Sequence, residues 1–292
     1  MGGQLQIISR ILKSNLSKTK QQIKDHLGLS LISLCLQLLL ILAVSVIFIG
    51  ASLDLSTDLQ KITNPLVQIT DDYQNADENE ILKQSAKMYS GYISLIKNMV
   101  KYTLLSLASF LIFGGLLWVT ANLMQQPRSN TKLNIKQVFT KPKIKYFFLL
   151  WRRFTERSLL VIIPYFAIAI ITIAILAEKD LNTFYAGLTF LLVLDILSGY
   201  LLFISVSILS QSGWKALAKS IKYLAIKKAK YILITAIATA AVLTVIGYLL
   251  YQVVLVSEVF SLMIIFVLML TASLFFARLY LTTLITEFNK NN

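Results

Sequence analysis

Six long apolar runs determine the architecture of this chain. Each run has about 20 residues with few charges, the length that an α-helix needs to cross the hydrocarbon core of a bilayer. Of the 292 residues, 57% are hydrophobic and only 14% are charged, an apolar content that a soluble domain has no means to bury. The sequence therefore predicts an all-α, polytopic membrane protein with a bundle of six transmembrane helices. The predicted spans are residues 27–52, 102–124, 158–177, 183–210, 231–252 and 259–280.

Polar segments flank and connect these spans within a predicted membrane domain over residues 27–280. Residues 1–26 are basic, with apolar residues at helical spacing, and predict an amphipathic helix on the membrane surface or, alternatively, a frayed cationic tail. Residues 54–101 hold seven of the fourteen acids and predict a solvated external loop, with a break at Asn64-Pro65. Residues 281–292 form a short polar tail.

Proline and capping patterns predict where some of these helices begin or bend. Asp77 followed by Glu80 is typical of a capping box that opens the helix leading into the second span. Pro142 is expected to interrupt any helix around it, because proline lacks an amide donor and clashes with the preceding turn. For the same reason Pro164 is expected to kink or loosen the third span.

The distribution of basic residues predicts the orientation. With six spans both termini lie on one side, and that side receives 22 of the 28 Lys and Arg residues. Ten of the fourteen acids fall on the other side. Because the cytoplasmic segments of membrane proteins are enriched in Lys and Arg, this bias predicts a multi-pass plasma-membrane protein with both termini in the cytoplasm. The connecting segments then form basic interfacial segments on the cytoplasmic face.

A cationic cytoplasmic face predicts contact with anionic lipid headgroups, to which each nearby Lys or Arg contributes about 1 kcal/mol. The net charge of +14 would suggest nucleic acid in a soluble protein, but lipid contact explains it here with no added assumption, so no nucleic-acid partner is expected. Homo-oligomerisation stays open. The candidate lipid contacts are Lys215, Lys219, Lys222, Lys227, Lys228, Arg152 and Arg153.

Asp195 is the second candidate site, because a carboxylate in the middle of an apolar helix is costly to insert. It lies twelve residues beyond Thr183, about 18 Å from the outer boundary at 1.5 Å per residue. It is expected to face the bundle or a wet cavity. The hydroxyl groups expected at the same depth belong to Tyr165, Thr239 and Thr271.

Composition and motifs argue against catalysis. With a single cysteine, Cys35, and a single histidine, His26, the chain cannot assemble a zinc site from nitrogen and sulfur ligands. It has no nucleophile elbow, no phosphate-binding glycine loop and no paired intramembrane carboxylates. The sequence therefore favours a non-enzymatic membrane scaffold or lipid-surface protein that needs no cofactor. The alternative is a transporter of small molecules or ions that uses Asp195 as a buried titratable site.

One stretch resembles a known family. Ala216-Leu217-x-x-Ser220-x-x-Tyr223, followed by Tyr231-Ile-Leu-Ile, is similar to a segment of six-helix prokaryotic integral membrane proteins. These include the membrane domain attached to some glycerophosphodiester phosphodiesterases. The similarity in layout covers roughly residues 100–280, and it concerns the membrane part without a catalytic domain. The resemblance therefore implies a type of fold and no activity.

Overall fold

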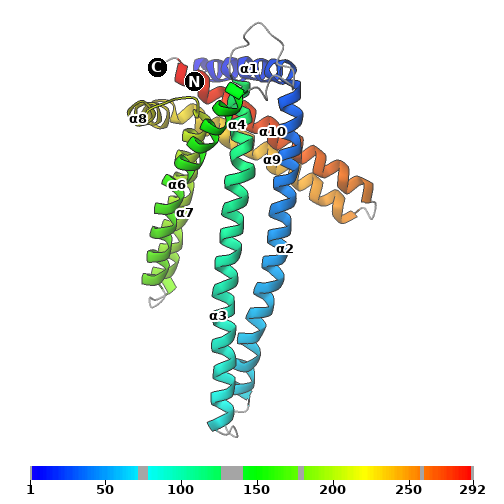
Figure 1. Ribbon diagram of the computed structural model, residues 1–292, viewed down its shortest axis with the longest axis vertical. Coiled ribbons are helices and arrows are strands. Elements are labelled where there is room, and N and C mark those ends of the chain that lie inside the picture. Colours follow the sequence, from blue (N-terminus) through cyan, green and yellow to red (C-terminus); the bar gives the residue numbers. More distant parts are fainter. Residues whose placement is uncertain (1, 72–77, 126–140, 177–180, 257–259, 291–292) are drawn as a thin grey trace. The chain divides into compact units, whose positions relative to one another are not determined.

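The computed structural model describes residues 2–71, 78–125, 141–176, 181–256 and 260–290. The protein is all-α, as predicted, and six of the described helices are long and apolar enough to cross a membrane (Figure 1). By helix length and hydropathy it is a multi-pass membrane protein. The elements are α1 (Gly2–Asp25), α2 (Leu27–Asp71), α3 (Glu78–Ser109), η1 (Phe110–Gly114), α4 (Gly115–Met124), α6 (Lys141–Leu176), α7 (Leu181–Ser207), α8 (Trp214–Lys222), η2 (Tyr223–Lys227), α9 (Ala229–Val256) and α10 (Phe260–Lys290), where η1 and η2 are π-helical turns.

Residues 39–113 form one compact unit, a hairpin built from the second half of α2 and from α3. Carboxylates of α2 bind side chains of α3. Asp58 accepts a hydrogen bond of 2.7 Å from Asn98 Nδ2 and is almost fully buried. Asp54 accepts one of 2.6 Å from the hydroxyl of Tyr102 and one of 3.0 Å from Lys101 Nζ. The prediction of a loop is therefore wrong for these acids, because they lie on α2 and bind side chains of α3.

The predicted break at Asn64-Pro65 is also wrong. Pro65 lies inside α2, which continues to Asp71. A proline in a helix removes one backbone hydrogen bond and crowds the preceding turn, and the rest of this 45-residue helix keeps its ladder on both sides of that site. The next helix, α3, begins at Glu78, while Asp77 of the predicted capping box lies outside the described residues.

The remaining residues, 1–38 and 114–292, form the second unit. Its main parts are two antiparallel hairpins, α6 with α7 and α9 with α10, whose helices lie side by side. The short helix α4 packs against α6, because Gly115 leaves room for the neighbouring rings. A Cβ atom at Gly115 would lie 2.6 Å from Nε1 of Trp151, so the two helices approach closely at this glycine.

Proline has a different effect in α6 from the one predicted. The helix begins at Lys141, so that Pro142 stands in its first turn, where the missing amide has no intrahelical partner to lose. It then continues through Pro164 to Leu176 as one helix. The described part of the basic segment before the third span, from Lys141 onward, is therefore part of the same helix as the span itself.

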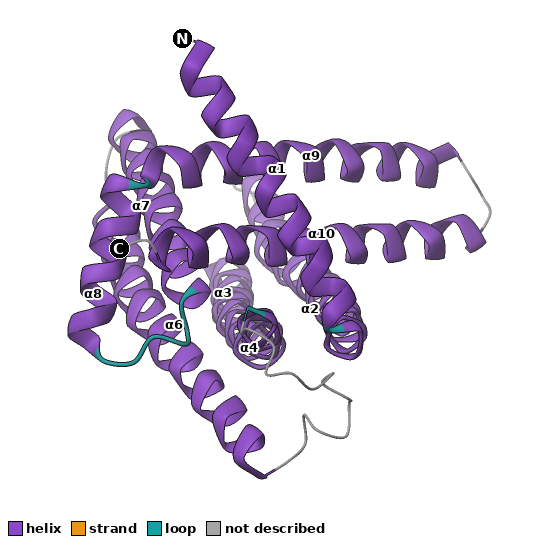
Figure 2. Cartoon of the chain, turned by 90° about the horizontal axis from the view of Figure 1, so that it is seen from above, coloured by secondary structure: helices purple, strands orange, loops and turns teal. Residues whose placement is uncertain are grey.

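The N-terminal segment is a helix, which confirms the helical reading over a frayed tail. Seen from above, α1 crosses over α9 and α10 (Figure 2), and it packs against α10. Its inward face is polar and includes the buried residues Asn15 and Thr19. Gln22 donates a hydrogen bond of 2.8 Å to Gln125 Oε1, and its own Oε1 accepts one of 2.9 Å from Thr283. These amide and hydroxyl groups connect α1 to the ends of α4 and α10.

Candidate functional site

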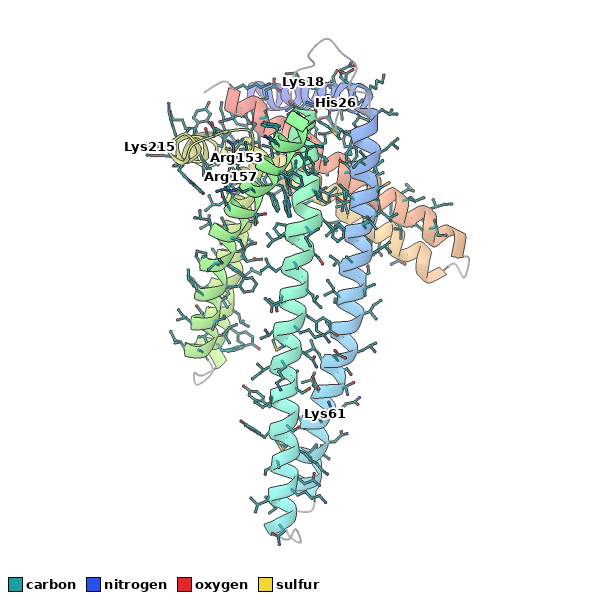
Figure 3. All side chains as sticks on the ribbon, viewed as in Figure 1. Lys18, His26, Lys61, Arg153, Arg157 and Lys215 are labelled. Carbon is teal, nitrogen blue, oxygen red and sulfur yellow. The ribbon has the colours of Figure 1, made fainter. Side chains whose placement is uncertain are left out.

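The short helix α8 presents a row of cations. Lys215, Lys219 and Lys222 are four and three residues apart, the spacing that places side chains on one face of an α-helix. All three side chains are exposed, and Figure 3 places Lys215 at the outer edge of this helix. Leu217 and Ser220 lie on the opposite face and are buried. The helix is therefore strongly amphipathic, with one lysine face and one packed face.

An apolar core fixes the packed face of α8 in place. Leu217 and the following Leu224 of η2 are buried against residues of α7, α9 and α10. Because the contacts come from three different helices, α8 cannot rotate without exposing apolar surface to water. The lysine face therefore has a fixed direction. The other buried members of this core are Ile204, Ile208, Ile232, Leu284, Ile285 and Phe288.

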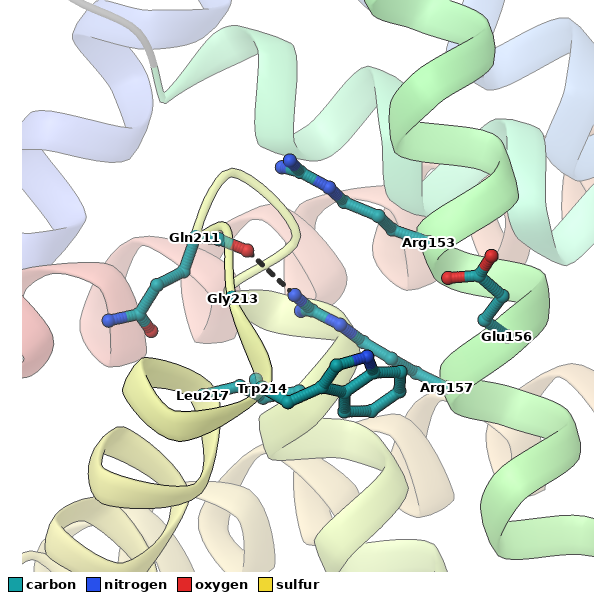
Figure 4. A pocket seen from close by; sticks show the side chains of 7 residues that line it. All are labelled: Arg153, Glu156, Arg157, Gln211, Gly213, Trp214 and Leu217. Atoms are coloured by element: carbon teal, nitrogen blue, oxygen red, sulfur yellow. Dashed lines mark hydrogen bonds between the residues drawn. The ribbon is translucent and has the colours of Figure 1, made fainter.

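Two arginines of α6 bind the turn that leads into α8. The buried guanidinium of Arg157 donates hydrogen bonds to the backbone oxygens of Ser205 at 2.7 Å and Ile208 at 3.0 Å. It also donates one of 2.8 Å to the backbone oxygen of Gln211 (Figure 4). Arg153 donates to the oxygen of Leu209 at 3.1 Å. The last carbonyl groups of a helix have no intrahelical donor and carry partial negative charge. The arginines supply those donors at the C-terminal end of α7.

Asn122 of α4 binds the same turn. Its Nδ2 donates to the oxygen of Val206 at 3.0 Å, and its Oδ1 accepts the amide of Leu209 at 3.1 Å. An asparagine side chain can do both because it carries a donor and an acceptor. Three side chains from two helices thus hold the residues between α7 and α8.

The turn ends at Gly213, whose φ of +91° is a conformation that side-chain-bearing residues rarely adopt. Between this glycine and α6 lies a small cavity of about 80 Å³ (Figure 4). Small-molecule sites usually measure about 300–1,000 Å³. The cavity is therefore a small packing gap between α6, the turn and α8, and it is too small for a typical ligand. Its lining residues are Arg153, Glu156, Arg157, Gln211, Gly213, Trp214 and Leu217.

The other predicted lipid contacts differ in what they can do. Lys227 is exposed, like the lysines of α8. Arg152 is largely exposed and forms an ion pair of 2.6 Å with Glu156 one turn further along α6. Arg153 is directed to backbone oxygens, so its first role is to hold the turn. The prediction treated all of these cations alike, and the structure separates them.

Lys228 lies among aromatic rings. Its Nζ is 5.4 Å from the ring centre of Phe288, 5.9 Å from that of Tyr223 and 6.0 Å from that of Tyr231. A cation above the face of an aromatic ring is attracted by the negative charge of that face. Lys228 therefore links the start of α9 to the end of α10. The sequence had instead suggested that Lys228 contacts lipid headgroups.

The Asp195 site differs from the prediction of a buried polar site. Asp195 is exposed on α7, where it accepts a hydrogen bond from the hydroxyl of Tyr165 on α6. Thr239 and Thr271 lie on the other hairpin, and each hydroxyl donates to a carbonyl of its own helix, that of Thr235 or Val267. The structure therefore brings one of the three expected hydroxyls to Asp195. The other two hydroxyls form hydrogen bonds with backbone oxygens of their own helices, α9 and α10.

Among the residues that the structure describes, no group of three His, Cys, Asp or Glu side chains could hold a metal ion. The functional residues that sequence reasoning missed are Arg157 and Asn122. Arg157 was counted only as one more cation of a basic segment. Asn122 lies at the end of an apolar span, where a lone amide gives no signal of its partner.

We compared the chain with protein-family models, curated proteins and solved structures. No family model, no curated protein and no solved structure matches it. The resemblance to the membrane domain of glycerophosphodiester phosphodiesterases therefore has no support from these comparisons. The fold and the geometry of the basic surface carry the argument instead.

Proposed function

We propose that this protein is a non-enzymatic, multi-pass plasma-membrane protein that uses a cationic cytoplasmic face to hold anionic lipid headgroups. The observation that carries the proposal is the fixed, exposed lysine face of α8, formed by Lys215, Lys219 and Lys222. Its packed face is held by the apolar core, and its first turn follows a segment held by Arg157. The lysines are thus ordered on a rigid support while their ammonium groups stay accessible.

The charge distribution supports the orientation in this proposal. Lys and Arg are enriched on the side that holds both termini, and cytoplasmic leaflets carry the anionic lipids. At about 1 kcal/mol for each lysine near the surface, three lysines contribute about 3 kcal/mol, which corresponds to an enrichment of roughly a hundredfold. Salt reduces this attraction, because the screening length is about 8 Å at physiological ionic strength.

Lipid association can be measured with spin-labelled phospholipids in reconstituted bilayers, where the lipids held by the protein give a motionally restricted signal. We expect the wild-type protein to prefer an anionic over a zwitterionic label. Changing Lys215, Lys219 and Lys222 together to Gln is expected to remove most of that preference, and high salt is expected to weaken it in the wild type.

A control variant with the same change in charge makes this test specific. Lys83, Lys87 and Lys97 of α3 are exposed and fall on the side assigned to the outside, so the triple change to Gln there alters the net charge equally. We expect this control to keep the lipid preference of the wild type. An equal loss in both triple variants, or no loss in either, contradicts a role for α8.

The orientation has its own test. An epitope inserted after Asp71, between α2 and α3, is expected to be reached by antibody on intact cells without permeabilisation. Protection of that epitope in intact cells overturns the cytoplasmic assignment of α8. Transport through Asp195 remains the alternative, but its exposed position on α7 does not favour it.

A further inference from the structure

A groove lies between the antiparallel helices α9 and α10, and α1 closes one end of it. Its volume is about 670 Å³, within the range of about 300–1,000 Å³ typical of small-molecule sites. It is much larger than the cavity beside Gly213. The residues that line it are Lys13, Leu16, Thr235, Ala238, Thr239, Val242, Leu243, Ile246, Ala272, Ser273, Phe276, Ala277 and Tyr280.

The sequence explains why these helices leave a groove. On α9 the lining positions recur at the three- and four-residue spacing of one helix face, from Thr235 to Ile246. Small side chains, Ala238 on one helix and Ala272 and Ala277 on the other, are part of this lining, while Phe276 is the largest apolar member. Eleven residues at 1.5 Å each give the groove a length of about 16 Å along α9.

The two ends of the groove differ in chemistry. Because α9 and α10 are antiparallel, Thr235 and Tyr280 lie at the end closed by α1. That end also holds Lys13, whose side chain is exposed and pairs with no carboxylate among the described residues. Toward Ile246 the lining is almost wholly apolar. The groove therefore has the positive charge of Lys13 at one end and an apolar trough beyond it.

We propose that this groove holds one acyl chain of an anionic glycerophospholipid, with the phosphate beside Lys13. Both α9 and α10 are candidate membrane spans, so the open side of the trough meets hydrocarbon, where acyl chains are the available apolar ligand. The ammonium group of Lys13 at one end matches a phosphate, and the hydroxyls of Thr235 and Tyr280 add donors to it. The proposal depends on membrane insertion and on no residue of α8.

The test is native mass spectrometry of the full-length protein released from anionic and zwitterionic phospholipid bilayers. We expect the wild type to retain one phospholipid through detergent exchange, with about a fivefold preference for the anionic lipid, from the contribution of one lysine. Ala238→Trp places an indole in the trough and is expected to lower lipid retention at least tenfold. Lys13→Gln is expected to keep the lipid but to lose the fivefold preference.

Ala240→Trp is the matched control, because Ala240 is exposed on α9 and does not line the groove. We expect this variant to retain lipid as the wild type does. Equal retention in Ala238→Trp and Ala240→Trp overturns the proposal, as does a lipid preference that survives Lys13→Gln. The triple Lys→Gln variant of α8 is expected to keep the retained lipid, so the two lipid proposals can fail separately.

Discussion

Arg157 offers the sharpest test of how α8 is positioned. Its guanidinium binds three backbone oxygens at 2.7–3.0 Å across the end of α7 and the following turn. Hydrogen bonds to charged groups contribute about 1.5–3 kcal/mol each, but such contributions are not additive. A buried carbonyl oxygen that loses its donor costs about 1–3 kcal/mol. We therefore expect Arg157→Gln to lower the free energy of unfolding by about 3 kcal/mol.

Arg157→Lys is expected to recover part of this loss. Lysine keeps the positive charge, but its ammonium group is a point donor without the planar fork that spans several carbonyls. The matched control is Arg152→Gln, which removes an arginine of the same helix whose side chain is 76% exposed. Exposed ion pairs contribute at most about 1 kcal/mol, so this control is expected to change little.

Hydrogen exchange measured by mass spectrometry checks the prediction for Arg157 locally. A loss of about 3 kcal/mol corresponds to exchange roughly a hundredfold faster at the amides of residues 208–217 in Arg157→Gln. Reversible unfolding in mixed micelles measures the global effect. If Arg157→Gln and Arg152→Gln give the same exchange in this segment, the arginine does not hold the turn and the reasoning is refuted.

Two further predictions concern the same end of the molecule. Gly213→Ala is expected to lower the free energy of unfolding by about 1–3 kcal/mol in the same unfolding assay, because a residue with a side chain is strained at a φ of +91°. The cause is backbone strain and not a clash, since no atom lies within 4 Å of the new Cβ. An unchanged stability would show that the turn tolerates other conformations. Lys228→Gln is expected to destabilise the protein by about 1–2 kcal/mol through the loss of its aromatic neighbours. Lys227→Gln, one residue earlier and near one ring only, is the control, and equal effects of the two changes would contradict the cation–ring interaction.

The helices could be predicted from the sequence because hydrocarbon imposes one strong rule. A chain that crosses a bilayer must satisfy its backbone hydrogen bonds internally, so each apolar run of sufficient length becomes a helix. The same rule does not determine where a helix ends outside the bilayer. There, α2 continues through Pro65 to Asp71, and its acids bind α3. Those side-chain pairs join residues about 40 positions apart, a separation that local patterns do not reveal.

The candidate site could be predicted only in part for a related reason. Lys215, Lys219 and Lys222 could be named as candidate lipid contacts because they lie in one short basic segment, and the structure places this segment on a helix with the three lysines on one face. Whether Arg157 turns inward depends on carbonyl groups about 50 residues further along the chain. The residue type was the one available signal, because arginine is better suited than lysine to bind several oxygens at once.

The charge count and the structure together divide the basic residues into two kinds. Helix ends near a membrane leave carbonyl groups that need donors, and Arg153 and Arg157 supply them for α7. A cation used in this way is directed inward and contributes little to a headgroup. Within the described part of the chain, the lysines of α8 have no such partner, and they remain exposed. The enrichment of Lys and Arg on one side therefore overestimates the charge available to lipid. It follows that lipid association should respond to the lysines of α8, whereas folding should respond to the arginines of α6.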